Sequence, residues 1–258
     1  MKLFKFVDSR GVDILKKERI KFTPPQEFKD PFEMQLGITN QAAKKFVRQI
    51  LDEREHQAMQ ELPGYKNLSH RQRKKGRREM VKTSEMVAIV RESFQKRTTD
   101  ESTEKLGILS LCESHDSNLM WYHYADGHRG FVLEFEDSNE EFRKLGKPWK
   151  VEYAHKPPAY DGMTAPLFFR FKPHYLLHEG EYRIIQFLQD CIPGKTEKGA
   201  TMFYRSLPRK CVKAVYLGHR MEKSVREEVL QLLKETDALK FDAIPSQEDY
   251  ALSFREIK

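Results

Sequence analysis

The stretch from Gly107 to Phe135 constrains the fold of this chain most, because two apolar runs enclose a polar and aromatic cluster. Residues 108–111 are mainly aliphatic, and residues 130–135 alternate with the two-residue period of a half-buried strand. The cluster between them has far more hydrogen-bonding and stacking capacity than a connector needs. It consists of Trp121, Tyr122, His123, Tyr124, Asp126 and His128. This order predicts a functional site flanked by two strands.

The same cluster also fits an amphipathic turn of helix. In that interpretation Leu119, Met120 and His123 face the core, and the aromatic rings contribute packing only. Aromatic residues at helical spacing are more often core residues than ligand contacts. Both interpretations stay open at this point.

The length of 258 residues suits one large domain or two small ones, and such a chain can bury a core without disulfides. Cys112, Cys191 and Cys211 have no paired spacing. The first residues lack the apolar core of a signal peptide, and no apolar run approaches the length of a membrane span. We therefore expect a cytoplasmic protein with reduced thiols and no membrane partner.

The positive charge of the chain is concentrated in one block, Lys66 to Lys82. This block contains eight Lys or Arg residues against one glutamate, a local balance of +7 that equals the formal net charge of the whole chain. Such a block attracts polyanions by releasing counterions from phosphates, which predicts a nucleic-acid partner. The candidate contacts are Arg73, Lys74, Lys75, Arg77 and Arg78. A solvated loop or an exposed helix face is the alternative.

Hydrophobic periodicity predicts strands and helices mixed without strict alternation, which indicates an α+β fold. The expected strands are residues 2–7, 19–22, 108–111, 130–135, 149–153, 182–188, 214–217 and 250–254. The expected helices are residues 9–17, 41–60, 79–95, 138–145 and 224–235. We expect one domain over residues 1–258, with residues 41–100 as a helical, basic insertion.

Three motifs carry a resemblance to known proteins: FKDPFE at residues 28–33, MWYHYA at residues 120–125 and EGEYR at residues 179–183. They resemble a bacterial family with the pattern FNDPFE, then MWxHYA, then ExEYR. This chain departs from the pattern at Lys29, where the family usually has asparagine.

The layout of the chain further resembles the ADP-ribosyltransferase superfamily, which includes toxins of anti-phage toxin–antitoxin systems that modify nucleic acid. The resemblance rests on Lys5 in the first strand, on Ser110 in a strand before an aromatic helix, and on a Glu-x-Glu pair opening a late strand. It implies a split β-sheet core, NAD as substrate and no catalytic metal. It also implies a nucleic-acid acceptor, with RNA favoured over DNA, and an antitoxin protein as a further partner.

Cleavage of the nicotinamide glycosidic bond builds positive charge on the ribose, so a carboxylate near the ribose stabilises the transition state. Glu181 is the candidate for this role. Residues two apart on a strand face the same side, so Glu179 is the candidate base for the acceptor. Tyr124 is the third catalytic candidate, because its ring, with Trp121 or Phe28, suits stacking on nicotinamide.

The remaining NAD-binding candidates are Lys5, Asp30, Ser110 and His123, which the resemblance places near ribose or phosphate. The alternative for both glutamates is a surface strand end that forms an exposed ion pair with Arg183, which contributes little.

Two other classes of function remain open. Cys112, His115, His123 and His128, or His174 with His178, have side chains that bind zinc, and a metal-dependent nuclease also explains the basic block. A non-enzymatic module that stacks unpaired bases on its aromatic rings is the other alternative.

Overall fold

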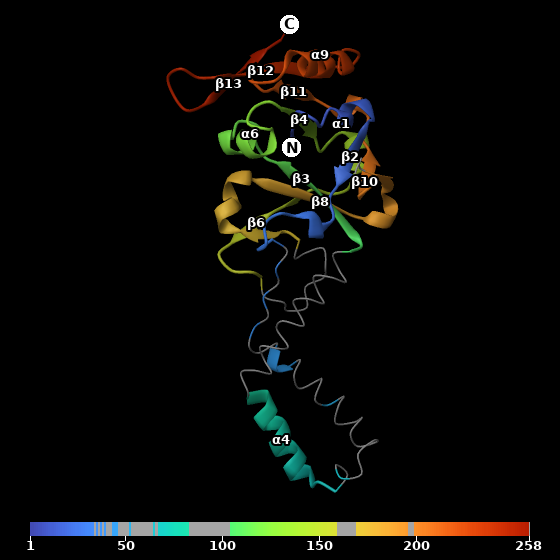
Figure 1. Ribbon diagram of the computed structural model, residues 1–258, viewed down its shortest axis with the longest axis vertical. Coiled ribbons are helices and arrows are strands. Elements are labelled where there is room, and N and C mark those ends of the chain that lie inside the picture. Colours follow the sequence, from blue (N-terminus) through green and yellow to red (C-terminus); the bar gives the residue numbers. More distant parts are fainter. Residues whose placement is uncertain are drawn as a thin grey trace. The chain divides into compact units, whose positions relative to one another are not determined.

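The computed structural model describes residues 1–33, 35, 37, 39, 43–45, 52, 64, 67–82, 104–158, 169–195 and 199–257. The chain divides into two compact units (Figure 1). The first consists of Met1–Glu33, Thr103–His155 and Arg170–Lys258, and the second of Met34–Ser102 and Lys156–Phe169. The second unit thus includes residues 41–100, where the insertion is expected, together with residues 34–40, 101–102 and 156–169.

The first unit contains an eight-stranded sheet (Figure 1). Its order is β13 (Leu252–Glu256), β12 (Leu239–Pro245), β11 (Ala214–Leu217), β4 (Phe131–Glu136), β1 (Lys2–Val7), β3 (Leu106–Cys112), β8 (Glu181–Phe187) and β5 (Trp149–Lys150). β11 and β12 run parallel, and the other neighbours are antiparallel. The three strands β1, β3 and β8, which are distant in sequence, are therefore adjacent in space.

Two smaller sheets accompany the large one. The first has the order β2 (Arg19–Phe22), β10 (Thr201–Ser206) and β9 (Ile192–Lys195), and the second pairs β6 (Glu152–Ala154) with β7 (Phe171–Pro173). The described helices are α1 (Asp13–Lys16), α4 (His70–Lys82), α6 (Asn118–Tyr124), α7 (Glu140–Arg143), α9 (Lys223–Leu232) and the 3-10 turns η1 (Pro25–Glu27), η2 (His174–Glu179), η3 (Leu188–Asp190) and η4 (Arg209–Cys211). Among these helices, none is both long and apolar enough to cross a membrane.

Apolar side chains cover both faces of the large sheet. On one face, Phe131 and Leu133 of β4 pack in a cluster that includes residues of α1, α7 and α9; on the other, Val132 packs with Met120 and Trp121 of α6. β4 is therefore buried on both faces, and the expectation of a half-buried strand is wrong there. The alternation that suggested it includes Glu134, which is buried and whose carboxylate accepts a hydrogen bond from the Tyr216 hydroxyl and pairs with Lys2.

The mixed composition of the fold confirms the α+β prediction. β1, β2 and β11 have the predicted bounds, whereas β7, β9, β10 and β12 were not predicted. The expected strand at residues 149–153 is divided between β5 and β6, and the expected helix at residues 9–17 contains only the short α1. The expected helices at residues 41–60 and 79–95 fall mainly outside the described residues.

Candidate active site

A pocket of about 440 Å³ opens in the first unit, beside the central strands of the large sheet. Its walls come from β1, the loop after β2, β3, α6, β7, η2 and the start of β8. A pocket of this size accommodates part of a cofactor or a small ligand. All the residues predicted for catalysis or NAD binding except Trp121 line it, and they are Lys5, Phe28, Asp30, Ser110, His123, Tyr124, Glu179 and Glu181.

Lys5, Ser110 and Glu181 meet because their strands are neighbours in the order β1, β3, β8. The Lys5 ammonium donates a hydrogen bond to the carbonyl oxygen of Ser110 at 3.0 Å. The Ser110 hydroxyl donates to the Glu181 carboxylate. Burial lowers the pKa of Lys5, although the carboxylate of Glu181 acts against that effect.

Glu179 and Glu181 reach the pocket from two different elements. Glu179 ends η2, Gly180 follows in the left-handed conformation at φ 49°, and Glu181 begins β8. The prediction that both glutamates lie on one strand and share its face is therefore wrong. The Glu181 amide donates to the Tyr153 hydroxyl at 2.8 Å, which fixes the start of the strand, and burial raises the pKa of Tyr153 to about 12.

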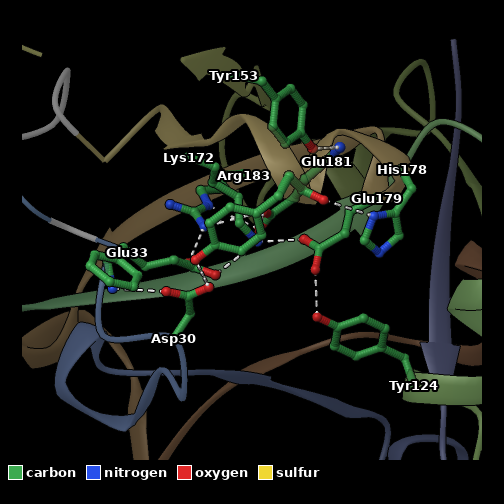
Figure 2. A network of polar contacts seen from close by, with 11 residues as sticks. Asp30, Glu33, Tyr124, Tyr153, Lys172, His178, Glu179, Glu181 and Arg183 are labelled. Carbon is green, nitrogen blue, oxygen red and sulfur yellow. Dashed lines mark hydrogen bonds and ion pairs between the residues drawn. The ribbon is translucent and has the colours of Figure 1, made fainter. Parts of the chain in front are cut away.

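Buried ion pairs join the carboxylates of the pocket (Figure 2). Lys172 Nζ lies 2.9 Å from Glu33 Oε1 and 2.9 Å from Glu181 Oε2, and it also contacts Glu179 Oε2. Arg183 Nε lies 2.9 Å from Glu181 Oε1, and Arg183 Nη2 lies 2.6 Å from Glu33 Oε2. The pairing of Glu181 with Arg183 is thus present, but it is buried and not exposed as the alternative interpretation held.

These charges determine the ionisation of Glu181. Burial by itself raises its pKa, but Arg183 and Lys172, with hydrogen bonds from Arg183 and Ser110, outweigh burial and lower the pKa from 4.5 to about 2. Burial by itself lowers the pKa of Lys172, but the neighbouring carboxylates outweigh it and raise the pKa. At neutral pH the pocket therefore holds an ionised Glu181 and a protonated Lys172.

Helix α6 begins at Ser117, whose hydroxyl accepts a hydrogen bond from the Met120 amide, and it places Tyr124 at the pocket. The Tyr124 ring is 47% exposed, and its hydroxyl donates to Glu179 Oε1 at 2.6 Å. Burial, with the hydrogen bond to Glu179, raises the pKa of Tyr124. One edge of α6 thus lines the pocket, while the first interpretation of the aromatic cluster, that it forms a functional site, stays a prediction.

Trp121 occupies a different position from the one predicted. It is fully buried, its ring packs edge-on against Phe6, and its indole nitrogen donates to the His115 carbonyl oxygen at 2.6 Å. The expectation that Trp121 stacks on nicotinamide is therefore wrong, because the packing of α6 on the sheet turns this ring into the core. The packing interpretation holds for Met120 and Trp121, whereas Leu119 and His123 are exposed.

The FKDPFE loop contributes both an aromatic wall and a carboxylate. The Phe28 ring lies against the Arg183 guanidinium, 5.3 Å from centroid to carbon. Asp30 accepts hydrogen bonds from the Phe32 amide at 2.8 Å and from the Tyr175 hydroxyl. The Asp30 carboxylate therefore holds the loop in shape at the edge of the pocket.

Four polar residues in and around the buried ion pairs were not among the predicted site residues. Glu33 and Arg183 lie inside the FKDPFE and EGEYR motifs, so those motifs pointed to them. Lys172 and Tyr153 lie outside every motif and come from β7 and β6. The pairing of those two strands places Tyr153 beside Lys172, which lines the pocket.

The cysteine and histidines proposed as zinc ligands are dispersed. Cys112 is buried, His115 stacks on Tyr216 with ring centroids 4.1 Å apart, and His128 stacks on Trp121 at 5.7 Å. In the part of the chain that the structure describes, no three His, Cys, Asp or Glu side chains form a group that could hold a metal ion.

Residues 70–82 of the basic block form helix α4 in the second unit. Lys74 and Lys75 are exposed and Arg73 is half-buried, whereas the side chains of Arg77 and Arg78 lie outside the described residues. An exposed, basic helix face agrees with both interpretations of the block, as a polyanion contact and as a solvated surface.

Comparison of the chain with models of protein families, with curated proteins and with solved structures gives no match. The assignment of a function therefore depends on the geometry of the pocket and on the motifs.

Proposed function

We propose that this protein is an NAD-dependent ADP-ribosyltransferase that modifies nucleic acid, with RNA favoured over DNA. The main support for this proposal is that Lys5, Ser110 and Glu181 line one pocket. The partly exposed Tyr124 lines the same pocket. The same three positions carry the resemblance of the motifs to this superfamily. A split β-sheet core of the ADP-ribosyltransferase kind is part of the proposal.

In the proposed reaction, the bond between ribose C1′ and the nicotinamide nitrogen breaks, and both electrons pass to nicotinamide. Positive charge develops on the ribose, and the ionised Glu181 carboxylate stabilises it and holds the 2′-hydroxyl. Tyr124 and Phe28 stack on the departing ring, while Lys5, Ser110 and His123 contact ribose or phosphate.

An acceptor hydroxyl or amine then attacks C1′, and Glu179 takes the proton that the acceptor loses. The products are the ADP-ribosylated acceptor, nicotinamide and one proton. Helix α4 contributes affinity for a polyanionic acceptor. A role as a toxin in anti-phage defence, with an antitoxin partner, rests on the resemblance of the motifs.

The test is incubation of the purified protein with NAD labelled in the adenylate part, in the presence of separate RNA, DNA and protein pools. We expect transfer to the RNA pool and release of nicotinamide. Glu181→Gln should reduce transfer about 100- to 1,000-fold, because it removes one charge that acts on the transition state. It should still fold, because the remaining carboxylates of Glu33 and Glu179 face Lys172 and Arg183.

Glu113→Gln is the matched control, since Glu113 is half-exposed and pairs with Lys150 outside the pocket. Full transfer by Glu181→Gln would overturn the mechanism. Binding of RNA with no consumption of NAD would favour the non-enzymatic binding module instead.

A further inference from the structure

Lys172, in the middle of β7, contacts three carboxylates at once (Figure 2). Its partners are Glu33, Glu179 and Glu181, and the side chains of all four residues are at most 7% exposed. An ammonium group has three donors, one for each carboxylate. Lys172 therefore has no donor left for a ligand, unlike a lysine that binds phosphate.

The three carboxylates come from separate parts of the chain. Glu33 ends the FKDPFE loop, Glu179 ends η2 and Glu181 begins β8. Carboxylates this close repel one another, and the left-handed Gly180 between Glu179 and Glu181 does not by itself fix the distance between their oxygens. A cation that contacts both the Glu179 and the Glu181 carboxylates offsets this repulsion and fixes the distance between them.

We propose that Lys172 is a positioning residue, which holds the carboxylates of Glu179 and Glu181 at the spacing that the reaction requires and ties both to the FKDPFE loop through Glu33. This inference rests on the proposed ADP-ribosyl transfer, in which the two glutamates have separate tasks. Lys172 lines the same pocket, but its three donors face carboxylates, so it acts through Glu179 and Glu181.

A purely structural role for Lys172 would require only its charge. Arginine keeps the charge but presents it as a planar fork in place of a compact ammonium, and the two are not interchangeable where geometry matters. A positioning role therefore predicts that Lys172→Arg folds but is a poorer enzyme.

The first measurement is acceptor-free hydrolysis of NAD by the whole chain. In Lys172→Met, kcat should fall about 100-fold, the size of effect that a displacement of about 1 Å produces. KM should stay within about twofold, since the three donors of Lys172 face carboxylates and none is left for NAD. Lys172→Arg should recover part of the loss, to about tenfold below the original kcat.

Lys150→Met is the matched control, because Lys150 makes a half-exposed ion pair with Glu113. It should leave kcat and KM unchanged. An unchanged kcat in Lys172→Met, or a raised KM with unchanged kcat, would overturn the inference.

The second measurement is the carboxyl titration of Glu181 by carbon-13 NMR, which needs no NAD. In Lys172→Met the Glu181 pKa should rise by about one unit or more from about 2, because one of its two cations is gone. In Lys150→Met it should not move. An unchanged titration in the Lys172 variant would overturn the inference even if the original protein did not consume NAD, so the two failures are distinguishable.

If Lys172→Met does not fold, the double variant Glu33→Gln, Lys172→Met takes its place. It removes one buried charge of each sign and leaves the balance of the network unchanged. The same fall in kcat is expected of it, and its absence would count against the inference in the same way. The rise in the Glu181 pKa should be smaller than in Lys172→Met, because loss of the Glu33 carboxylate favours the ionised form of Glu181.

Discussion

Glu181 carries a negative charge where its side chain is only 3% exposed, between the cations of Arg183 and Lys172. Buried ion pairs are weak evidence for stability, because desolvation offsets much of the attraction. The lowered pKa of Glu181 is more informative about function, since strongly shifted pKa values concentrate at functional sites. The ionised state of Glu181 is therefore the property of this site that substitutions of single residues can test.

Two substitutions of Tyr124 distinguish the contribution of its ring to NAD binding from that of its hydroxyl. Tyr124→Ala should raise the KM for NAD about tenfold, because a stacking surface worth about 0.5–1.5 kcal/mol is lost together with its buried area. Tyr124→Phe should keep the KM but lose the hydrogen bond to Glu179. Steady-state hydrolysis kinetics measure both effects. Tyr122→Ala is the control, since Tyr122 is 66% exposed on the same helix. Equal unfolding of both Tyr124 variants would support a packing role.

The stability of the first unit should depend on pH through Glu181. Its folded pKa of about 2 lies below the ordinary 4.5, so its contribution is complete above pH 4.5 and is lost as the pH falls toward 2. A shift of this size corresponds to about 3 kcal/mol. Urea unfolding between pH 6 and pH 2, followed by tryptophan fluorescence, measures it. Glu181→Gln should lack this part of the decrease, and parallel curves for the two proteins would contradict the assignment.

At the scale of elements, the site depends on how η2 joins β8. The turn ends in Gly180 with a positive φ of 49°, so a left-handed residue separates the two glutamates. A Cβ added at Gly180 would lie 2.8 Å from Glu113 Cγ. Both the backbone conformation and the available space therefore favour glycine at this position.

Gly180→Ala should destabilise the protein by about 1–2 kcal/mol, the cost of the left-handed conformation for a residue with a Cβ. It should also reduce kcat, because Glu179 and Glu181 would both move. Gly199→Ala is the control: its φ is 82°, and a Cβ there meets nothing within 4 Å. Thermal unfolding and NAD hydrolysis of both variants are the measurements. A loss of activity in Gly199→Ala equal to that in Gly180→Ala would contradict a local effect at the site.

At the scale of the whole molecule, the pocket and the basic helix belong to different units. The proposed function gives them different tasks, since the pairing of Lys and Arg with phosphate contributes affinity without any chemistry. We therefore expect substitutions in α4 to weaken binding of the acceptor without changing the reaction of NAD in the pocket.

Neutralisation of Arg73, Lys74, Lys75, Arg77 and Arg78 should weaken binding of single-stranded RNA. It should also reduce the slope of log affinity against log salt by up to about 3.5, at about 0.7 for each phosphate that is no longer neutralised. Acceptor-free hydrolysis of NAD should remain close to the original rate. Titrations of RNA at several salt concentrations measure the slope. An unchanged slope and unchanged transfer would indicate that the acceptor is not held by α4, and would favour a protein acceptor.

The sequence by itself determined the α+β class and the strands whose apolar pattern is local, such as β1, β2 and β11. It also determined the candidates Lys5, Ser110, Tyr124, Glu179 and Glu181, because motifs and the chemistry of carboxylates depend on residue type. These are properties that a short window of residues carries.

The tertiary structure decided what depends on residues distant in sequence. β7 pairs with β6 and thereby brings Lys172 to Glu33, Glu179 and Glu181. The packing of α6 on the sheet buries Trp121 and exposes Tyr124, although both belong to one motif. The pairing of Glu181 with Arg183 is local in the sequence, but its burial and the contacts of Lys172 arise only where separate segments meet. The strength of the Glu181 ionisation and the position of Lys172 could therefore not be read from a local pattern.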